Sequence, residues 1–153
     1  MKPLILAVAA AAAVATASQA AAPAIAVSDA WARPTPPGAT TGAVYATLTN
    51  RQPIADALLS ATSPEAAKVE FHSMTMTGGV MHMNAVTGPQ KLQPGVALRF
   101  DPGAAHIMLV GLKAPLKLGG HVTVVLRFAR AGVITVEAPV SNAAPDGMAG
   151  MKM

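Results

Sequence analysis

The 153-residue chain contains no cysteine, and only 3% of its residues are aromatic and 12% charged. Without cysteine it forms no disulfide and has no thiolate to act as a metal ligand or nucleophile. A blue-copper electron-transfer centre, which requires a cysteine ligand, is therefore excluded. Any soft-ligand chemistry must come from methionine and histidine.

Charge is also sparse, with a formal net charge of +4. The basic residues are scattered and no aromatic stacking platform accompanies them, so we expect no nucleic-acid partner. The seven carboxylates form no obvious acid–base pair with a histidine, and the chain lacks a Gly-x-Ser-x-Gly motif and a phosphate-binding glycine loop. We therefore expect that the protein is not an enzyme.

A long apolar run is missing beyond the first residues. Residues 1–22 are typical of a secretory signal peptide, with Lys2, an alanine-rich stretch and small residues before a cleavage point near Ala20. No later run reaches the roughly 18 apolar residues of a membrane span, so no transmembrane segment is expected. We predict a domain over 23–142, a flexible methionine-containing tail over 143–153 and, for this cysteine-free exported chain, a periplasmic location.

Short β-prone segments separated by proline and glycine make up the rest of the chain. No sustained helical periodicity occurs, and residues 63–68 allow a single helical turn at most. This pattern predicts an all-β fold, an antiparallel sandwich or barrel. The expected strands are 25–31, 43–49, 57–62, 67–76, 80–86, 96–100, 105–111, 121–128 and 132–140.

Methionine and histidine concentrate between residues 72 and 83. Gly78-Gly79 is a strong signal for a two-residue hairpin turn. Because alternate residues of a strand share a face, one face of this hairpin would carry His72 and four thioethers, with His72 diagonal to Met83. The expected cross-strand pairs are Met76 with Met81 and Met74 with Met83. His82 would face the other way, with the threonines.

A second segment has the same pattern, because His106 and Met108 share one face of an expected strand. If the two faces meet, they offer two imidazoles and two thioethers. Thioethers suit Cu(I) rather than zinc, magnesium or calcium, and imidazole suits copper in either oxidation state. Four neutral ligands also favour a monovalent ion in a site of low polarity. The pattern therefore predicts a Cu(I) site, and it leaves open whether Cu(II) also binds at a secondary site.

The same residues allow a different interpretation. Methionine commonly fills gaps in a protein core, and a methionine-rich surface can also adapt to protein partners. The alternative function is therefore a secreted β-sandwich interaction module whose methionine-rich hairpin is a protein-binding surface. Its partner binding would be unchanged by a Cu(I) chelator.

The spacing of these residues resembles the motif of the periplasmic copper chaperone family called PCuAC, in which a His, ten residues, a Met, about twenty-one residues and His-x-Met follow one another. Here His72 and Met83 have ten residues between them, and His106-Ile-Met108 completes the pattern. Twenty-two residues separate Met83 from His106, and the turn-rich segment 87–95 can accommodate the extra one. Segments 29–38, 69–72, 109–113 and 115–120 also look like family sequence, and the resemblance covers roughly residues 25–140.

The resemblance implies a cupredoxin-like antiparallel β-sandwich of Greek-key type with His72, Met83, His106 and Met108 as Cu(I) ligands. It also implies delivery of copper to a respiratory oxidase: the acceptor would be a cytochrome c oxidase subunit or a thioredoxin-like assembly factor.

The family motif leaves several residues without a role. Met74, Met76 and Met81 would either pack around the site or form a soft surface over which copper passes by ligand exchange. His82 and His121 are expected to be surface residues. In the tail, Met148, Met151 and Met153 are either a weak copper-collecting segment or inert.

Overall fold

Strand β9 (His121–Phe128) shows how the alternating sequence builds the sandwich. Val122, Val124 and Leu126 are buried, whereas the residues between them are more exposed. The period of two matches the pleat of a strand with one face in the core. β10 (Gly132–Pro139) pairs with β9 along its whole length in antiparallel register. The strand expected over 121–128 is confirmed.

The computed structural model describes residues 24–145, and strands, turns and loops account for all of them. The fold is all-β, as expected, and ten strands occur in this range. The other eight are β1 (Ile25–Ala32), β2 (Thr41–Asn50), β3 (Asp56–Thr62), β4 (Ala66–Thr77), β5 (Val80–Ala85), β6 (Gln90–Leu92), β7 (Ala97–Phe100) and β8 (Ala105–Leu112).

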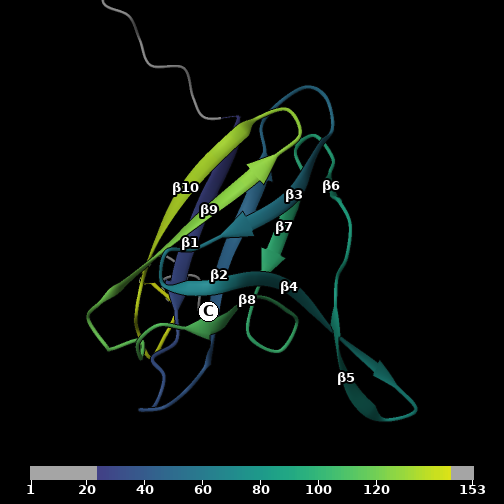
Figure 1. Ribbon diagram of the computed structural model, residues 1–153. Helices are drawn as coiled ribbons and strands as arrows, with labels where there is room; N and C mark the ends of the chain where they lie inside the picture. The colour runs from purple at the N-terminus through teal and green to yellow at the C-terminus, as the bar shows by residue number, and fades with distance from the viewer. Residues whose placement is uncertain (1–23, 146–153) are drawn as a thin grey trace, which may run out of the picture.

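Two antiparallel sheets pack face to face (Figure 1). The larger has the order β1-β2-β8-β4-β5, with β7 beside β2, and the smaller has the order β10-β9-β3-β6. Strand β2 pairs with β8 through residues 41–44 and with β7 through residues 46–49. The architecture is therefore the predicted sandwich, not a closed barrel.

The nine expected strands all occur, each within two residues of its predicted ends. Strand β6 was not predicted, because its three residues lie in the segment 87–95, whose glycines and prolines predict turns. It pairs with β3, and Leu92 is buried in the core. Where a helical turn was considered, residues 64–65 form a turn, and β4 begins at Ala66, which pairs with Leu112.

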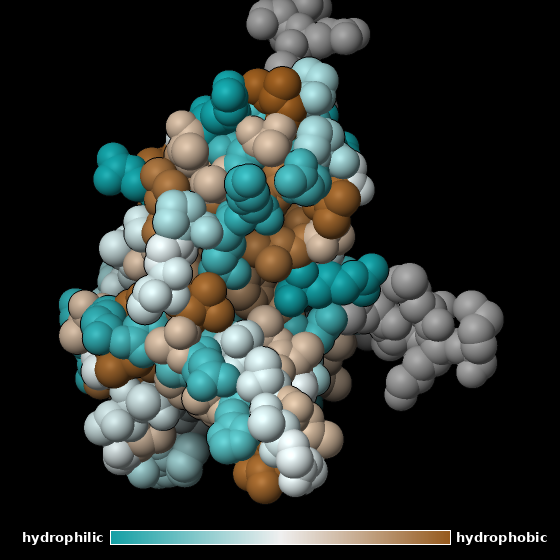
Figure 2. Space-filling view, turned by 90° about the vertical axis from the view of Figure 1, so that its right-hand side faces the viewer, coloured by the Kyte–Doolittle hydropathy of each residue, from teal (hydrophilic) through white to brown (hydrophobic). Residues whose placement is uncertain are grey.

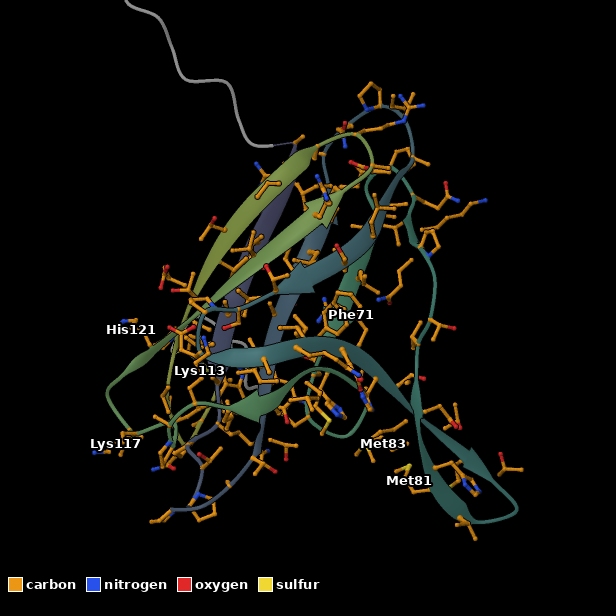
Figure 3. All side chains as sticks on the ribbon, in the orientation of Figure 1. Phe71, Met81, Met83, Lys113, Lys117 and His121 are labelled. Carbon is orange, nitrogen blue, oxygen red and sulfur yellow. The ribbon has the colours of Figure 1, made fainter. Side chains whose placement is uncertain are left out.

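The core lies between the two sheets and contains no methionine. Its largest fully buried side chains include Phe100, Leu48 and Leu126, and Figure 3 shows Phe71 on the inner side of β4. The five methionines of residues 24–145 all lie outside this buried set. Filling of the core, the commonest use of methionine, therefore does not explain their number here.

A buried carboxylate holds one end of the smaller sheet. Asp56 accepts hydrogen bonds from the backbone N–H groups of Ala57, Arg130 and Ala131 and from the Gln52 side chain, at 2.8 to 2.9 Å. Burial raises the pKa of this carboxyl group, but the four donors outweigh it and the net pKa is lowered. Asp56 therefore links the start of β3 to the β9–β10 turn as a carboxylate.

The β4–β5 hairpin extends beyond the sandwich (Figure 1). Every residue of β5 is exposed. Figure 2 views the molecule from this side, and the lower part of its surface presents apolar residues among polar ones. Among residues 24–145, the hairpin is thus a two-stranded extension that no second layer covers, unlike the rest of the larger sheet.

Candidate metal centre

The turn of the hairpin has the geometry that its glycines predict. Gly78 and Gly79 both have positive φ, 59° and 79°. Such values at both central residues characterise the type I′ turn, which matches the twist of the flanking strands. The turn sets the expected register, in which Met76 pairs with Met81 and Met74 pairs with Met83.

The centre of the candidate site is a pair of histidines on adjacent strands. His72 of β4 and His106 of β8 are direct cross-strand partners. Their rings stack with centroids 5.4 Å apart and an interplanar angle of 20°. His106 is 6% exposed and the His72 side chain 13%. The fold thus brings together the two histidines that the sequence placed in separate segments.

The two methionines of the expected site flank this pair on opposite sides along the strands. Met108 is two residues from His106 and pairs with Glu70 of β4. Ala85 is the β5 partner of His72, which places Met83 on the diagonal, beyond the pair toward the hairpin turn. Met83 is 52% exposed. All four side chains lie on the outer face of the larger sheet, because the residues alternating with them, such as Phe71 and Ile107, are in the core.

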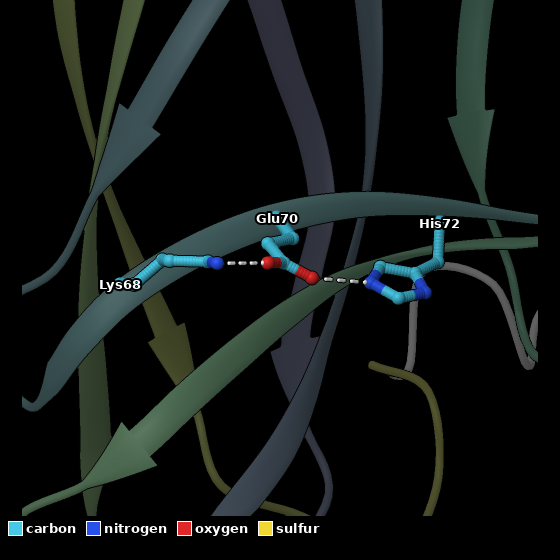
Figure 4. Close-up of polar contacts among 3 residues, drawn as sticks. All are labelled: Lys68, Glu70 and His72. Carbon is cyan, nitrogen blue, oxygen red and sulfur yellow. Dashed lines mark hydrogen bonds and ion pairs between the residues drawn. The ribbon is translucent and has the colours of Figure 1, made fainter. Parts of the chain in front are cut away.

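A carboxylate orients His72. One Glu70 oxygen lies 2.8 Å from Nε2 of His72, and the other pairs with the Lys68 ammonium at 2.5 Å (Figure 4). The hydrogen bond from Lys68, followed by that from His72, lowers the pKa of Glu70. Glu70 is therefore ionised and accepts a hydrogen bond from Nε2–H of His72. In the neutral form of the ring, this tautomer has its free lone pair on Nδ1.

That nitrogen has no partner of its own. Nδ1 of His72 is buried and makes no hydrogen bond within residues 24–145. Buried polar atoms are normally satisfied, and an unpaired one indicates a missing water or ion. A carboxylate on the far nitrogen of a ligating histidine is also the common arrangement around metals. The donor set therefore fits a metal ion at Nδ1.

His106 is in a suitable protonation state. Burial lowers the pKa of its imidazole, and the neighbouring His72 lowers it further. It is therefore neutral at neutral pH, and a metal ion would not have to displace a proton from it.

Glu70 and Lys68 were missed by the sequence reasoning, and the expectation that no carboxylate pairs with a histidine was wrong. The signal was present, because Lys68, Glu70 and His72 alternate along one strand and so share a face. Within residues 24–145, histidine and carboxylate side chains form no group of three that could hold a metal ion. Any further side-chain ligand for a metal at the histidine pair would therefore be a thioether from the neighbouring methionines.

Two aromatic residues lie on the same outer face of the larger sheet, on the two strands that precede β8 in the strand order. Trp31 pairs with Tyr45, and their ring centroids are 5.0 Å apart. Tyr45 is one residue beyond Val44, which pairs with Ile107, so it points away from the core on the side of His106. The chain's single tryptophan, on β1, is therefore separated from His106 of β8 by strand β2.

Comparison with known proteins gives the family. Residues 25–140 match the model of the LpqE-like family, described as putative lipoproteins. The chain belongs to this family. A putative lipoprotein of Leifsonia xyli subsp. xyli, Lxx21020, is 31% identical over 118 residues, 77% of this chain and 70% of that protein. The uncharacterized protein RP573 of Rickettsia prowazekii is 30% identical over 101 residues; the alignment spans 64% of this chain and 56% of that protein.

Solved structures show the same fold as this LpqE-like protein. The copper-bound PCuAC domain from PmoF2 matches with a TM-score of 0.66 at 23% identity, over 81% of this chain and 97% of that one. The solution structure of CuI-DR1885 from Deinococcus radiodurans matches with a TM-score of 0.58 at 31% identity, over 75% and 77%. The fold is therefore the PCuAC-type β-sandwich, as the resemblance implied.

The remaining candidates of the LpqE-like chain lie away from the histidine pair. His82 pairs with Thr75 on the other face of the hairpin, and both His82 and His121 are exposed, as expected. His121 lines a cavity of about 440 Å³ with Lys113 and Lys117. Figure 3 shows these three residues at the opposite end of the molecule from Met81 and Met83.

Several predictions concern residues beyond the described range. The signal peptide over 1–22 and the tail methionines Met148, Met151 and Met153 lie outside residues 24–145. The domain limits at 23–142 and 143–153 stay predictions. Within the described part of the chain, no helix is long and apolar enough to cross a bilayer.

Proposed function

We propose that this protein is a periplasmic copper chaperone that binds Cu(I) through His72, Met83, His106 and Met108. The observation that carries the proposal is the stacked pair of His72 and His106, in which Nδ1 of His72 is buried without a partner and Glu70 holds the other nitrogen. Two neutral imidazoles next to thioethers form a ligand set with no formal charge. Such a set suits a soft monovalent ion.

The relatives support the choice of metal. One solved PCuAC domain with this fold is copper-bound, and the CuI-DR1885 structure, at 31% identity, carries Cu(I) in its name. The chemistry of the site supports the oxidation state, because thioethers bind Cu(I) better than the harder Cu(II). A secondary Cu(II) site is a further part of the proposal that the same titrations can test.

The exposure of the site favours transfer to another protein over permanent storage. Met83 is on an exposed strand, whereas His106 is buried. An acceptor can therefore approach the methionine side and replace its ligands one at a time. As acceptors we propose a cytochrome c oxidase subunit or a thioredoxin-like assembly factor. Nothing in the proposed role requires catalysis by the protein itself.

The test is an anaerobic competition titration of the protein with Cu(I) against a colourimetric Cu(I) chelator. We expect one tight site in the wild type and its loss in a His106→Ala/Met83→Leu double variant. The matched control is His121→Ala/Val80→Leu, which changes an exposed histidine and an apolar hairpin residue outside the ligand set. Tight Cu(I) binding that survives in the double variant would overturn the ligand assignment.

A second candidate function follows from the exposed apolar side chains of the hairpin, Met76 and Val80 among them. In that case the hairpin is a protein-docking surface and the histidine pair is structural. A wild type that fails to compete with the chelator, together with partner binding that is unchanged by the chelator, would support this alternative.

A further inference from the structure

Three methionines of the hairpin have no place in the four-ligand site: Met74, Met76 and Met81. We propose that they form a second Cu(I) site made of thioethers alone. Met76 is 67% exposed and Met81 48%, so two of the three sulfurs lie at the surface of the hairpin. Met74, nearer the sandwich, is half-buried.

Packing within the chain does not account for these side chains. The hairpin extends beyond the sandwich, and β5 is exposed along its full length (Figure 1). Apart from Val80, the opposite face of the hairpin is polar, with a hydrogen bond of 3.1 Å from Asn84 to Thr75. An apolar side chain left in water contributes no burial energy, and none of the three belongs to the buried core.

The register brings the three sulfurs within reach of one ion. Met76 and Met81 are direct cross-strand partners, with Cβ atoms expected about 5 Å apart. Met74 is two residues from Met76 on the same strand and diagonal to Met81, a separation of about 7–8 Å that long side chains can span. The unbranched methionine side chain has three rotatable bonds, so the sulfurs can converge without moving the backbone.

Figure 3 shows Met81 and Met83 on the same side of the hairpin. This agrees with the alternation that puts Met74 and Met76 on that face too. The glycine turn supports the arrangement, because its two positive-φ residues hold the strands in one register. The thioether face is therefore pre-arranged, and only side-chain rotamers have to change when an ion binds.

The chemistry of the three groups selects the ion. Thioethers are neutral and soft, so they discriminate against zinc, magnesium and calcium and favour Cu(I). The site contains no imidazole, carboxylate or amine. Its affinity should be lower than that of the histidine site, because imidazole adds a stronger donor and burial excludes competing water.

The position of the second site suits a role in passing copper to and from the histidine site. Met74 is the cross-strand partner of Met83, which is one of the four ligands proposed above. An ion held by Met76 and Met81 near the turn could move to Met74 and Met83 and then to the histidines by exchange of one sulfur at a time. This role as an entry or exit step rests on the proposed function, whereas binding by the three thioethers does not.

The experiment is an anaerobic Cu(I) titration of the full chain labelled with ¹³C at the methionine methyl groups, followed by NMR. We expect the Met83 and Met108 methyl signals to shift with the first equivalent and those of Met74, Met76 and Met81 with the second. In a Met74→Leu/Met76→Leu/Met81→Leu variant, only the first equivalent should bind. The matched control is Val80→Leu, which changes apolar bulk at the turn but removes no sulfur.

A His72→Ala/His106→Ala variant separates this inference from the proposed function. The three hairpin methyl signals should still shift in this variant, now with the first equivalent. If they do so while the wild type lacks a tight histidine site, the second site stands and the proposed function fails. If the wild type binds one tight equivalent and the three methyl signals do not move with further Cu(I), the second site is refuted and the proposed function stands.

Discussion

The two-layered sandwich body and the β4–β5 hairpin, which continues its larger sheet, use apolar side chains in opposite ways. In the body, valine, leucine and phenylalanine face inward between two layers and are buried. In the hairpin, Met76, Val80 and Met81 face water. Hydrophobic burial thus stabilises the body, whereas the thioethers of the hairpin are free to contact an ion or a partner. Strand β4 belongs to both regions, and the histidine pair lies where one region ends and the other begins.

The largest difference between body and hairpin is expected when a core side chain is shortened. Leu126 of β9 is fully buried, so Leu126→Ala removes buried apolar surface and leaves a cavity. We expect the free energy of unfolding to fall by about 3–4 kcal/mol. Urea denaturation measures it, with Met76→Ala as the hairpin counterpart. Equal losses of unfolding free energy in Leu126→Ala and Met76→Ala would contradict the conclusion that burial stabilises only the body.

A second test removes the buried carboxylate of the body. Asp56→Ala leaves three backbone N–H groups without their acceptor and removes the shorter of the two hydrogen bonds from the Gln52 side chain, so we expect a loss of roughly 3 kcal/mol in unfolding free energy. Because the folded pKa of Asp56 is lower than that of the unfolded chain, about 3.9, its contribution is present above about pH 4 and is lost as the pH falls through the folded pKa. The unfolding free energies of wild type and variant, measured by denaturation between pH 6 and pH 3, should therefore approach each other as the pH falls. The matched control is Asp101→Ala, which removes a carboxylate that accepts none of these four hydrogen bonds.

Glycine substitutions compare turns of the two regions directly. Gly79 in the hairpin and Gly132 at the start of β10 share a φ of 79°, and neither has an atom within 4 Å of an added Cβ. Alanine at either position should cost about 1–2 kcal/mol of backbone strain. We expect Gly132→Ala to lower global stability, and Gly79→Ala only to reduce amide exchange protection in β5. A lower urea midpoint for Gly79→Ala would show that the hairpin unfolds with the body.

The smallest effect is expected from the thioethers themselves. Met76→Leu/Met81→Leu preserves apolar bulk on an exposed face, so the free energy of unfolding should change by less than about 0.5 kcal/mol. Thermal denaturation without metal measures this. A clear loss of stability would mean that the two side chains pack against the protein after all.

Much of the fold was predictable because its signals are local. Apolar residues at every second position of 121–128 predicted β9. The Gly78-Gly79 pair correctly predicted the hairpin and its register. Strand β6 was missed because three residues cannot show a period of two, and it forms only by pairing with β3.

The site was predictable in part. The hairpin register could be counted from its turn, but the pairing of His72 with His106 depends on β8 lying next to β4, a contact between distant segments. The resemblance supplied the residues, and the fold supplied their arrangement. The role of Glu70 could have been found from its alternation with His72 on one strand.

The sequence by itself determined which ligands the protein can offer, because side-chain chemistry does not depend on the fold: no thiolate, few carboxylates, and methionines next to histidines. It also determined local pairing, since turn residues and the pleat act over a few positions. Only the tertiary structure decided which nitrogen of His72 is free, how deeply His106 is buried and which methionines remain in water. Burial and long-range strand order are properties of the assembled layers, and they bury His106 beside His72 while they leave Met76, Met81 and Met83 exposed.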